Sequence, residues 1–252
     1  MLRLIFTIGL LVSVVFGDKI TVFAAADLRF ALDEVKEAFL KQNPSHEMEM
    51  IYGSSGKGLH QVENGAPYHL YYSANEAFVE KLYSQGDIIT KPRLYALGRV
   101  VIWSTHPKFD ANKGFDNLNE SWVKKIAIAS PAHAPYGEKA KQALESLNLY
   151  KNVETKLVLG ENISHTAQFV QSGAADIGII ALSLALAPTI ADSKTSSYYL
   201  IDDKLHEPLL QGYGITKYAK DSKLAFEFYD FTLTDDAMKI MKKYGFETPK
   251  DN

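Results

Sequence analysis

The chain has 252 residues, of which 46% are hydrophobic, and its formal net charge is −3. This apolar content is enough for one large or two small domains, and without a basic block or an acidic tail nothing indicates a nucleic-acid-binding protein. The chain contains no cysteine, which excludes disulfides, so the folded protein must be held together by its core.

The first 17 residues are predicted to be a signal peptide. Arg3 supplies the positive charge, residues 4–15 form the apolar segment, and Val15-Phe16-Gly17 provides a cleavage site. The apolar segment is shorter than the roughly 20 residues that span a bilayer, although an uncleaved anchor is the alternative. No cysteine follows the cleavage site to carry a lipid. We therefore expect a freely diffusing periplasmic protein.

Strand-like and helix-like segments alternate along the rest of the chain. Strands are predicted at residues 19–24, 47–52, 70–73, 97–104, 126–129, 157–159, 177–181 and 211–216. Helices are predicted at residues 28–39, 76–84, 137–147 and 164–172, with two more between 223 and 244. Repeated β-then-α units predict an α/β fold with parallel sheets that are covered by helices on both faces.

No Pro/Gly/Ser-rich linker divides the chain, so two lobes would have to be joined by strands that cross between them. The apolar segment 97–104 and the return segment 211–216 are the natural crossings. We predict one lobe from residues 18–96 plus 207–252, and a second, inserted lobe from residues 97–206. A cleft between such lobes lies beyond the carboxyl ends of the strands, where α/β proteins bind ligands.

Three junctions between a strand and a helix share one chemistry. They are Ala25-Ala26-Asp27-Leu28, Tyr52-Gly53-Ser54-Ser55-Gly56-Lys57-Gly58 and Gly160-Glu161-Asn162-Ile163-Ser164. Each pairs small or hydroxyl-bearing residues with a helix start, whose unpaired N–H groups and partial positive charge suit an anion. Neutral donors that converge on an oxyanion make strong hydrogen bonds, whereas ordinary helix capping is the competing interpretation of each junction.

Other kinds of site fit the sequence less well. The glycine spacing around Lys57 does not match a phosphate-binding loop, because no Ser or Thr follows the lysine. The seven histidines are scattered and none pair at metal-ligand spacing, although His165 lies beside the third junction and is the best candidate for a pocket edge. Ser54 and Ser55 lack the Gly-x-Ser-x-Gly elbow, and no carboxylate pair stands out, so we do not expect an enzyme.

In this order the motifs resemble the periplasmic molybdate-binding proteins of ABC uptake systems. The motifs that carry the resemblance are Thr21-Val22-Phe23-Ala24-Ala25-Ala26-Asp27-Leu28, Tyr52-Gly53-Ser54-Ser55-Gly56, Asn64-Gly65-Ala66-Pro67, Tyr71-Tyr72-Ser73-Ala74-Asn75, Pro131-Ala132-His133-Ala134-Pro135-Tyr136-Gly137, Gly160-Glu161-Asn162-Ile163 and Lys243-Tyr244-Gly245-Phe246. The resemblance implies a type II periplasmic binding protein with two lobes. Each lobe is then a mixed, mostly parallel sheet flanked by helices, with the ligand cleft between the lobes.

The resemblance also implies a ligand and the residues that bind it. The ligand is a tetrahedral oxyanion, molybdate or tungstate, so molybdenum or tungsten reaches the protein only inside its oxyanion, and no other cofactor is expected. The implied binding residues are Asp27, Ser54, Ser55, Tyr136, Ile163 and Ala181. The implied partner is an inner-membrane ABC permease, and a monomer that binds no nucleic acid is expected.

Two of these positions depart from the family pattern. Some family members have a tyrosine hydroxyl where this chain has Ala181, and Ser183 and Tyr213 are possible replacements. At Asp27 a carboxylate replaces a serine donor, and two unit charges about 4 Å apart repel by about 4 kcal/mol at an effective dielectric constant near 20. Arg29 and Lys57 nearby would soften this repulsion.

Three arrangements would remove the conflict at Asp27. The carboxylate could turn away and cap its own helix, which we favour, or it could be protonated in the closed cleft. Alternatively, the ligand could itself carry a proton, as hydrogen phosphate does. A phosphate-binding protein of the same fold, an exported interaction protein that has lost transport and, with less support, an exported hydrolase are the alternative functions.

Overall fold

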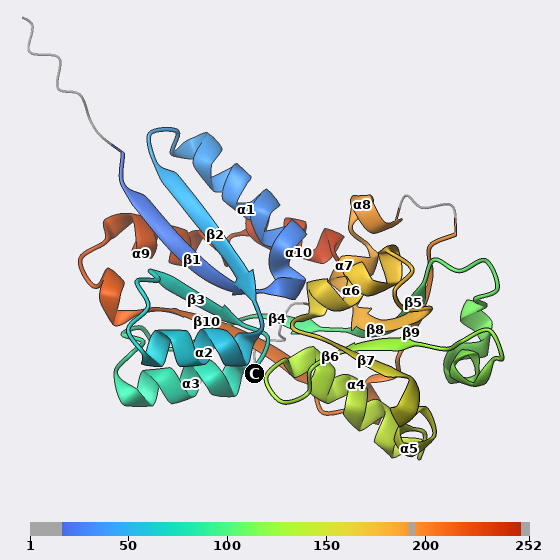
Figure 1. Ribbon diagram of the computed structural model, residues 1–252. Helices are drawn as coiled ribbons and strands as arrows, with labels where there is room; N and C mark the ends of the chain where they lie inside the picture. The colour runs from blue at the N-terminus through green and yellow to red at the C-terminus, as the bar shows by residue number, and fades with distance from the viewer. Residues whose placement is uncertain (1–16, 192–194, 248–252) are drawn as a thin grey trace, which may run out of the picture.

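The computed structural model describes residues 17–191 and 195–247, which form two lobes side by side (Figure 1). Each lobe is a five-stranded sheet flanked by helices. The predicted signal peptide, apart from Gly17, lies outside the described residues. Among the residues that are described, no helix combines the length and apolar character needed to cross a bilayer.

The first sheet is built from the beginning and the end of the chain, in the order β2-β1-β3-β10-β4. Its strands are β1 (Lys19–Ala25), β2 (Glu47–Gly53), β3 (Leu70–Ser73), β4 (Arg93–Gly98) and β10 (Leu209–Ile215). β1 pairs in parallel with β2 and β3, whereas β10 runs antiparallel to β3 and β4. The C-terminal part of the chain therefore supplies a central strand of this sheet.

The two faces of the first sheet bury different helices, because successive side chains of a strand point in opposite directions. Ile20, Val22 and Ala24 share one core cluster with residues of α1 (Arg29–Gln42), α9 (Lys223–Phe231) and α10 (Asp235–Lys243). Phe23 points to the other face, where it packs with α2 (Ser55–Glu63) and α3 (Glu76–Gln85). The alternation along one strand thus accounts for two helical layers.

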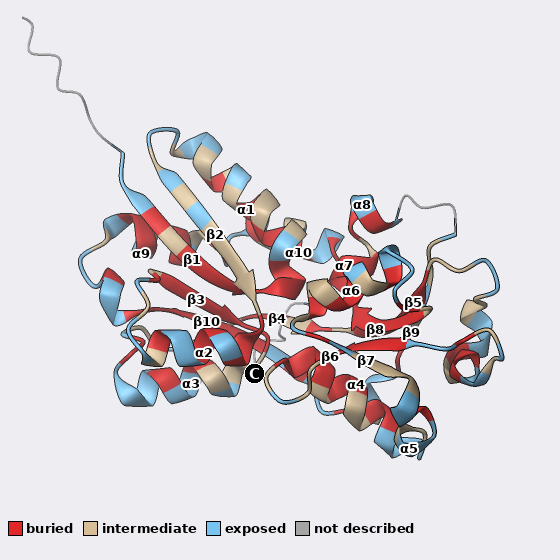
Figure 2. Cartoon of the chain, in the orientation of Figure 1, coloured by how far each residue is buried: buried red, intermediate tan, exposed pale blue. Residues whose placement is uncertain are grey.

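The second sheet has the order β7-β6-β8-β5-β9 and is built from the middle of the chain. Its strands are β5 (Val100–Ser104), β6 (Ile126–Ala129), β7 (Leu157–Gly160), β8 (Ile177–Ala181) and β9 (Ser197–Leu200). Its helices are α4 (Pro135–Ser146), α5 (Tyr150–Val153), α6 (Ile163–Gln171), α7 (Leu182–Ala185) and α8 (Pro188–Ala191), and a 3₁₀ segment covers Ala111–Asn119. β5, β6 and β8 are buried throughout and form the centre of the larger core, which is red in Figure 2.

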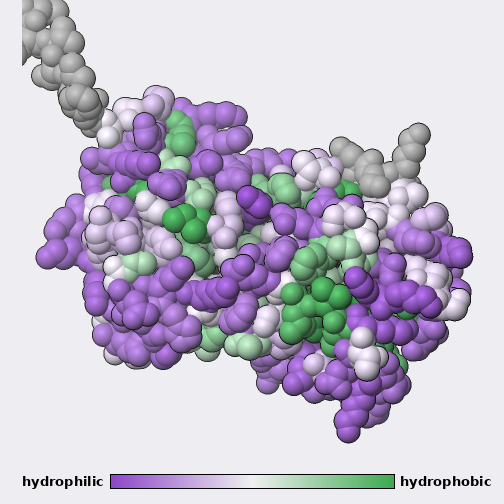
Figure 3. Space-filling view, in the orientation of Figure 1, coloured by the Kyte–Doolittle hydropathy of each residue, from purple (hydrophilic) through white to green (hydrophobic). Residues whose placement is uncertain are grey.

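The surface is largely hydrophilic, as Figure 3 shows for one face. An apolar patch on that face lies over β6 and β7 of the second lobe. β7 is an edge strand, and Leu159 within it is 54% exposed.

The predicted two-lobe α/β fold is confirmed, and each sheet is mixed, with four of its five strands running in one direction and β10 or β5 running opposite to the rest. Each sheet contains two parallel and two antiparallel pairings. The antiparallel pairings belong to β10 and β5, the strands that begin where the chain has just crossed from the other lobe. The strands of the β-then-α units end at the cleft, whereas β10 and β5 begin there, so these two strands run in the opposite direction.

The single strand predicted for residues 97–104 is wrong. β4 ends at Gly98 and β5 begins at Val100, so that Arg99 alone separates two strands that belong to different sheets. The return crossing uses residues 201–208. The strands of the first sheet lie within residues 19–98 and 209–215, and the strands of the second sheet lie within residues 100–200. The boundaries of the lobes themselves, at 96/97 and 206/207, stay a prediction.

Candidate functional site

A small cavity lies between the lobes where several helices begin. It is lined from the first lobe by Ala25, Ala26, Asp27, Gly53, Ser54, Ser55 and Ala74, and from the second by Ala134, Pro135, Tyr136 and Ile163. Its volume is about 10 Å³, about the space that one water molecule needs. A four-oxygen anion would therefore enter only when the lobes move apart.

Three helix starts direct backbone donors toward this cavity. Ser55 is the first residue of α2, Ile163 is the first residue of α6, and Tyr136 follows Pro135 at the start of α4. The N–H groups of a first helical turn have no acceptor within the helix, and the helix dipole is positive at this end. Pro135 costs nothing here because a proline in the first turn has no N–H to leave unpaired.

The Ser55 side chain is held so that its proton can point into the cavity. Its Oγ accepts a hydrogen bond from the Ala74 N–H at 2.9 Å, and its carbonyl accepts one from the Tyr71 hydroxyl at 2.7 Å. Both contacts use oxygen lone pairs, so the hydroxyl hydrogen of Ser55 is left to donate.

The neighbouring hydroxyl belongs to Ser54, which is also buried. Its Oγ lies 3.0 Å from Nδ1 of His133, a residue of the second lobe. Burial, and next the charge of Lys57, lower the pKa of His133, so near neutral pH the imidazole is uncharged.

Asp27 does not cap a helix, and our favoured prediction for its side chain is wrong. It lies inside a 3₁₀ turn, η1 (Ala26–Leu28), whose cap position is Ala25, and the following helix α1 is preceded by Leu28. Because the turn begins one residue before Asp27, the carboxyl group is not placed to cap it. Oδ2 instead accepts a hydrogen bond from Nε2 of Gln211 at 2.9 Å, and Oδ1 is buried without a partner.

Gln211 joins Asp27 to both lobes. Its Nε2 also donates to the Tyr136 hydroxyl at 3.0 Å, and its Oε1 accepts a hydrogen bond from the Tyr95 hydroxyl at 2.7 Å. Burial raises the pKa of Asp27 to about 6, although Gln211, Tyr136 and the backbone N–H groups of Asp27 and Leu28 oppose the rise. The carboxyl group thus lies in a dry, mostly neutral environment with no cation as a hydrogen-bonding partner.

Direct contacts between the lobes surround the cavity. The Ser164 and Ser183 hydroxyls of the second lobe donate to the Ala26 and Asp27 carbonyls, both at 2.8 Å. The Gly56 N–H of the first lobe donates to the His133 carbonyl at 2.9 Å. These hydrogen bonds hold the lobes together in the present arrangement.

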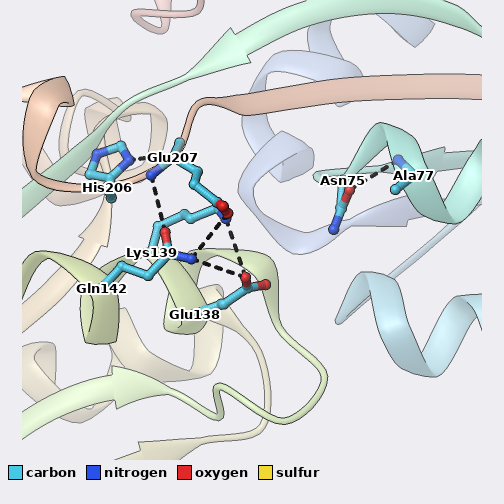
Figure 4. Close-up of polar contacts among 7 residues, drawn as sticks. All are labelled: Asn75, Ala77, Glu138, Lys139, Gln142, His206 and Glu207. Carbon is cyan, nitrogen blue, oxygen red and sulfur yellow. Dashed lines mark hydrogen bonds and ion pairs between the residues drawn. The ribbon is translucent and has the colours of Figure 1, made fainter. Parts of the chain in front are cut away.

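The lysines nearest the cavity are already paired with acids. Lys57 lies 2.8 Å from Glu161 across the lobes. On another side of the cavity a groove of about 300 Å³ separates α3 from α4, and there the buried Lys139 lies 2.8 Å from Glu207 and 3.3 Å from Glu138 (Figure 4). Apart from Asp27, the surface that faces the cavity is therefore built from neutral groups.

The structure brings together five of the six predicted binding residues. Asp27, Ser54, Ser55, Tyr136 and Ile163 all line the cavity. Ala181 does not: it ends β8, and the helix start that follows it is closed, because the Leu182 N–H donates to the Arg99 carbonyl.

Neither suggested replacement for a tyrosine at Ala181 lines the cavity. The Ser183 hydroxyl binds the Asp27 carbonyl, and the Tyr213 hydroxyl donates to the Tyr229 carbonyl inside the first lobe. His165 lies in a separate groove that it shares with Arg29. In the described part of the chain, no group of three or more His, Asp or Glu side chains could hold a metal ion.

Sequence reasoning missed Gln211, His133 and the Tyr136 side chain. One signal was available, since Gln211 is a polar residue in the otherwise apolar segment Leu209–Ile215, and it lies at an irregularity in the pairing of β10 with β4. Nothing in the sequence indicates that its amide meets Asp27, 184 positions away.

Comparison with known proteins adds independent information. A family model described as bacterial extracellular solute-binding protein matches residues 20–247. The chain is 31% identical to the molybdate-binding protein ModA of Azotobacter vinelandii, over 94% of this chain and 93% of that protein. It is 32% identical, over 90% of this chain and 85% of the other, to YvgL of Bacillus subtilis, which is provisionally named an ABC transporter substrate-binding lipoprotein.

Solved structures agree with these relatives. The periplasmic molybdate-binding protein of Azotobacter vinelandii matches with a TM-score of 0.85 and 30% identity, covering 92% of this chain and all of that one. The sulfate-binding protein SubI of Mycobacterium tuberculosis, at 16% identity and a TM-score of 0.73, covers 92% of this chain and 88% of its own and shares the fold.

Proposed function

The chain belongs to the bacterial extracellular solute-binding protein family, and we propose that it captures molybdate or tungstate for an ABC-type uptake system. The observation that carries this proposal is the convergence of three helix starts and the Ser55 hydroxyl on one cavity between two lobes. The relatives named for molybdate binding match nearly the whole chain, which supports the choice of anion.

In the proposed complex the protein binds the oxygens of the anion and never its metal atom. The N–H groups of Ser55, Tyr136 and Ile163 and the Ser55 hydroxyl are the donors, and hydrogen bonds to a charged acceptor are about twice as strong as neutral ones. The anion enters between separated lobes, which then close around it by a hinge motion. Closure brings donors of both lobes onto the same oxygens.

We propose no catalytic step for this site. Ser54 and His133 have the spacing of a nucleophile and its base, since their side-chain atoms lie 3.0 Å apart. Within the described residues, no carboxylate accepts a hydrogen bond from the His133 ring and so orients it. The contact is better explained as one that positions the Ser54 hydroxyl across the two lobes.

The proposed location is the periplasm, after removal of residues 1–17. The chain has no cysteine and cannot carry the thioether-linked lipid of a bacterial lipoprotein, which distinguishes it from the named lipoprotein YvgL. The proposed partner is an inner-membrane permease that accepts the anion from a monomer.

Titration calorimetry on the ligand-stripped chain from residue 18 tests the proposal. We expect submicromolar binding of molybdate and tungstate and little binding of sulfate, in line with the relatives that are named for molybdate binding. Ser55→Ala removes one charge-assisted hydrogen bond and should weaken molybdate binding about 10- to 100-fold. Ser172→Ala, at an exposed serine near the end of α6, is the matched control and should leave the affinity unchanged.

Two results would contradict the proposal. Phosphate binding with no heat from molybdate or tungstate would favour a binding protein for a protonated oxyanion. No heat from any of the four anions would favour an interaction protein that has kept only the fold.

A further inference from the structure

One oxygen of the Asp27 carboxyl group has an unused hydrogen-bonding capacity. Asp27 is 1% exposed and lines the cavity, and its Oδ1 is buried with no hydrogen-bonding partner. A charged oxygen without a donor is strongly disfavoured in a buried site. A protonated Oδ1 would be a donor, and it would need an acceptor in the cavity.

The hydrogen bonds of Gln211 fix which carboxyl oxygen can carry a proton. Its Oε1 accepts from the Tyr95 hydroxyl, so its amide nitrogen must face Asp27, where it donates to Oδ2 at 2.9 Å. Oδ2 is therefore an acceptor in this network. A proton on the carboxyl group must lie on Oδ1, on the unpartnered side.

We propose that Asp27 binds the anion in its protonated form, with Oδ1 donating to an anion oxygen, so that capture of one divalent anion takes up one proton. The inference rests on the proposed function and deepens it. It turns a carboxylate that would repel the ligand into a neutral donor like the others in the cavity. The proton comes from solvent as the lobes close.

The electrostatic environment of Asp27 supports this coupling. Its pKa is already about 6 because of burial, and a divalent anion in the same cavity would raise the pKa further through like-charge repulsion. At pH 7 to 8 the carboxyl group is mostly ionised in the empty protein and protonated in the complex. The affinity should therefore fall about tenfold for each pH unit above 6 and level off below it.

The groups that face Asp27 from the surrounding elements do not supply an alternative charge. Tyr136 from α4 and Tyr95 from β4 are neutral, because burial, and next the charge of Asp27, raise the pKa of both. Among the titratable residues of the elements packed around η1, Arg29 of α1 and His165 of α6 line a separate groove, and Tyr52 of β2 donates its hydroxyl proton to Asp33. The remaining titratable residues of α1 and β2 do not line the cavity; they are Asp33, Glu34, Lys36, Glu37, Lys41, Glu47 and Glu49. α7 contributes no titratable residue.

Two other ionisable side chains, those of Lys57 and His133, lie near the cavity. Lys57 is paired with Glu161, which limits its field at the cavity. His133 contacts Ser54 and could itself take up a proton, so it is the residue that an experiment must separate from Asp27.

The test is calorimetry of molybdate binding in two buffers with different ionisation enthalpies. The dependence of the measured heat on the buffer gives the number of protons taken up. We expect about one proton per anion at pH 8 and close to none at pH 5, where Asp27 is already protonated before binding.

Two variants assign the proton. In Asp27→Asn the amide oxygen can accept from Gln211 while the amide nitrogen donates to the anion, which imitates the protonated acid. This variant should take up no proton and should bind with an affinity that does not change between pH 6 and 8. His133→Gln should still take up about one proton at pH 8, even if binding weakens.

The outcomes separate this inference from the proposed function. Binding of molybdate at pH 8 without proton uptake overturns the inference and leaves the function standing, whereas no binding of molybdate or tungstate at any pH overturns the function itself. Loss of proton uptake in His133→Gln would assign the proton to the imidazole and overturn the inference. Loss of all binding in a folded Asp27→Asn protein would also overturn it, because a neutral donor would then not suffice.

Discussion

At the scale of single residues, Asp27 differs from every other side chain of the cavity. Ser54, Ser55 and Tyr136 bring neutral polar groups, and Ile163 brings a backbone N–H at a helix start. Asp27 brings a group that is charged in water and is here 1% exposed. With the lobes closed and no ligand bound, the folded protein must therefore bear the free-energy cost of either burying a charge or binding a proton.

This cost predicts how stability depends on pH. The pKa of Asp27 rises from 3.8 to about 6 on folding, so the folded state binds its proton more tightly than the unfolded state does. The unfolding free energy contributed by Asp27 therefore falls as the pH rises from about 4 to 6, and the full loss is about 3 kcal/mol above pH 6. Asp27→Asn avoids the loss.

Urea unfolding of the ligand-free protein measures this effect. At pH 7 Asp27→Asn should be more stable than the wild type by up to about 3 kcal/mol, and near pH 3.5 the two should be nearly equal. Asp221→Asn, at an exposed side chain, is the control and should not show this pH dependence. A stability difference for Asp27→Asn that does not change with pH would contradict the assignment.

The sequence predicted five residues that line the cavity, because they follow strands at helix starts, a pattern that is local in the chain. The prediction that the Asp27 carboxylate caps its own helix was wrong, because the side chain is oriented by Gln211, which comes from β10 near the other end of the chain. Sequence reasoning failed for Ala181 because the neighbouring helix start is closed by the carbonyl of Arg99. Contacts between distant segments decide both cases.

At the scale of elements, the helix starts are the functional units. α2, α4 and α6 each present a first turn to the cavity, so whatever fixes the first turn also fixes a donor. The start of α6 is fixed by Asn162, whose side chain accepts a hydrogen bond from the His165 N–H at 2.9 Å. Asn75 caps α3 in a similar way, because its side chain accepts a hydrogen bond from the Ala77 N–H at 3.0 Å (Figure 4). That helix starts outside the cavity.

This pair of caps separates stability from binding. Asn162→Ala and Asn75→Ala should each lower the unfolding free energy by about 1 kcal/mol, because each removes an N-cap. Only Asn162→Ala should also weaken molybdate binding, since it loosens the turn that carries the Ile163 N–H. Chemical unfolding and calorimetry on both variants check this. Equal affinities in the two variants would show that the start of α6 does not contribute a donor.

The positions of most strands could be read from the sequence, and β3, β6 and β8 have the predicted bounds. The segment 97–104 could not be divided correctly, because β4 and β5 are both apolar and only Arg99 lies between them. Hydrophobicity shows that a segment is buried, but it does not show in which of two cores.

At the scale of the whole molecule, the two lobes repeat one pairing scheme without a visible sequence repeat. In each sheet the first three strands, counted from one edge, pair in parallel (β2-β1-β3 and β7-β6-β8). The fourth strand, β10 or β5, pairs antiparallel with the third strand and with the fifth, which is the other edge of the sheet. The contacts that bring the lobes together include close backbone approaches, of which the Gly56 N–H to the His133 carbonyl is one. Lobe closure therefore requires glycine at position 56, where a side chain would collide with the opposite lobe.

Gly56→Ala should block closure without harming the fold. A Cβ atom there would lie 2.7 Å from the His133 carbonyl oxygen, and that oxygen belongs to the opposite lobe. Molybdate affinity should fall at least about tenfold, while the ligand-free protein should be as stable as the wild type or slightly more so, because alanine favours a helix.

Small-angle scattering gives a second readout of closure. The wild type should become more compact when molybdate is added, and Gly56→Ala should not. Gly212→Ala is the control, because its Cβ would lie 3.5 Å from its nearest neighbours, an ordinary contact. Undiminished affinity and compaction in Gly56→Ala would show that the lobes close along a different path.

The central position of β10 in the first sheet also affects the order in which the chain can fold. β4 pairs with β10 and not with β3, so it has no partner in the first lobe until residue 209 has been delivered. All five strands of the second lobe precede that residue. A chain that crosses a membrane from its N-terminus can therefore finish the inserted lobe first, while the lobe that began earlier waits for its last strand.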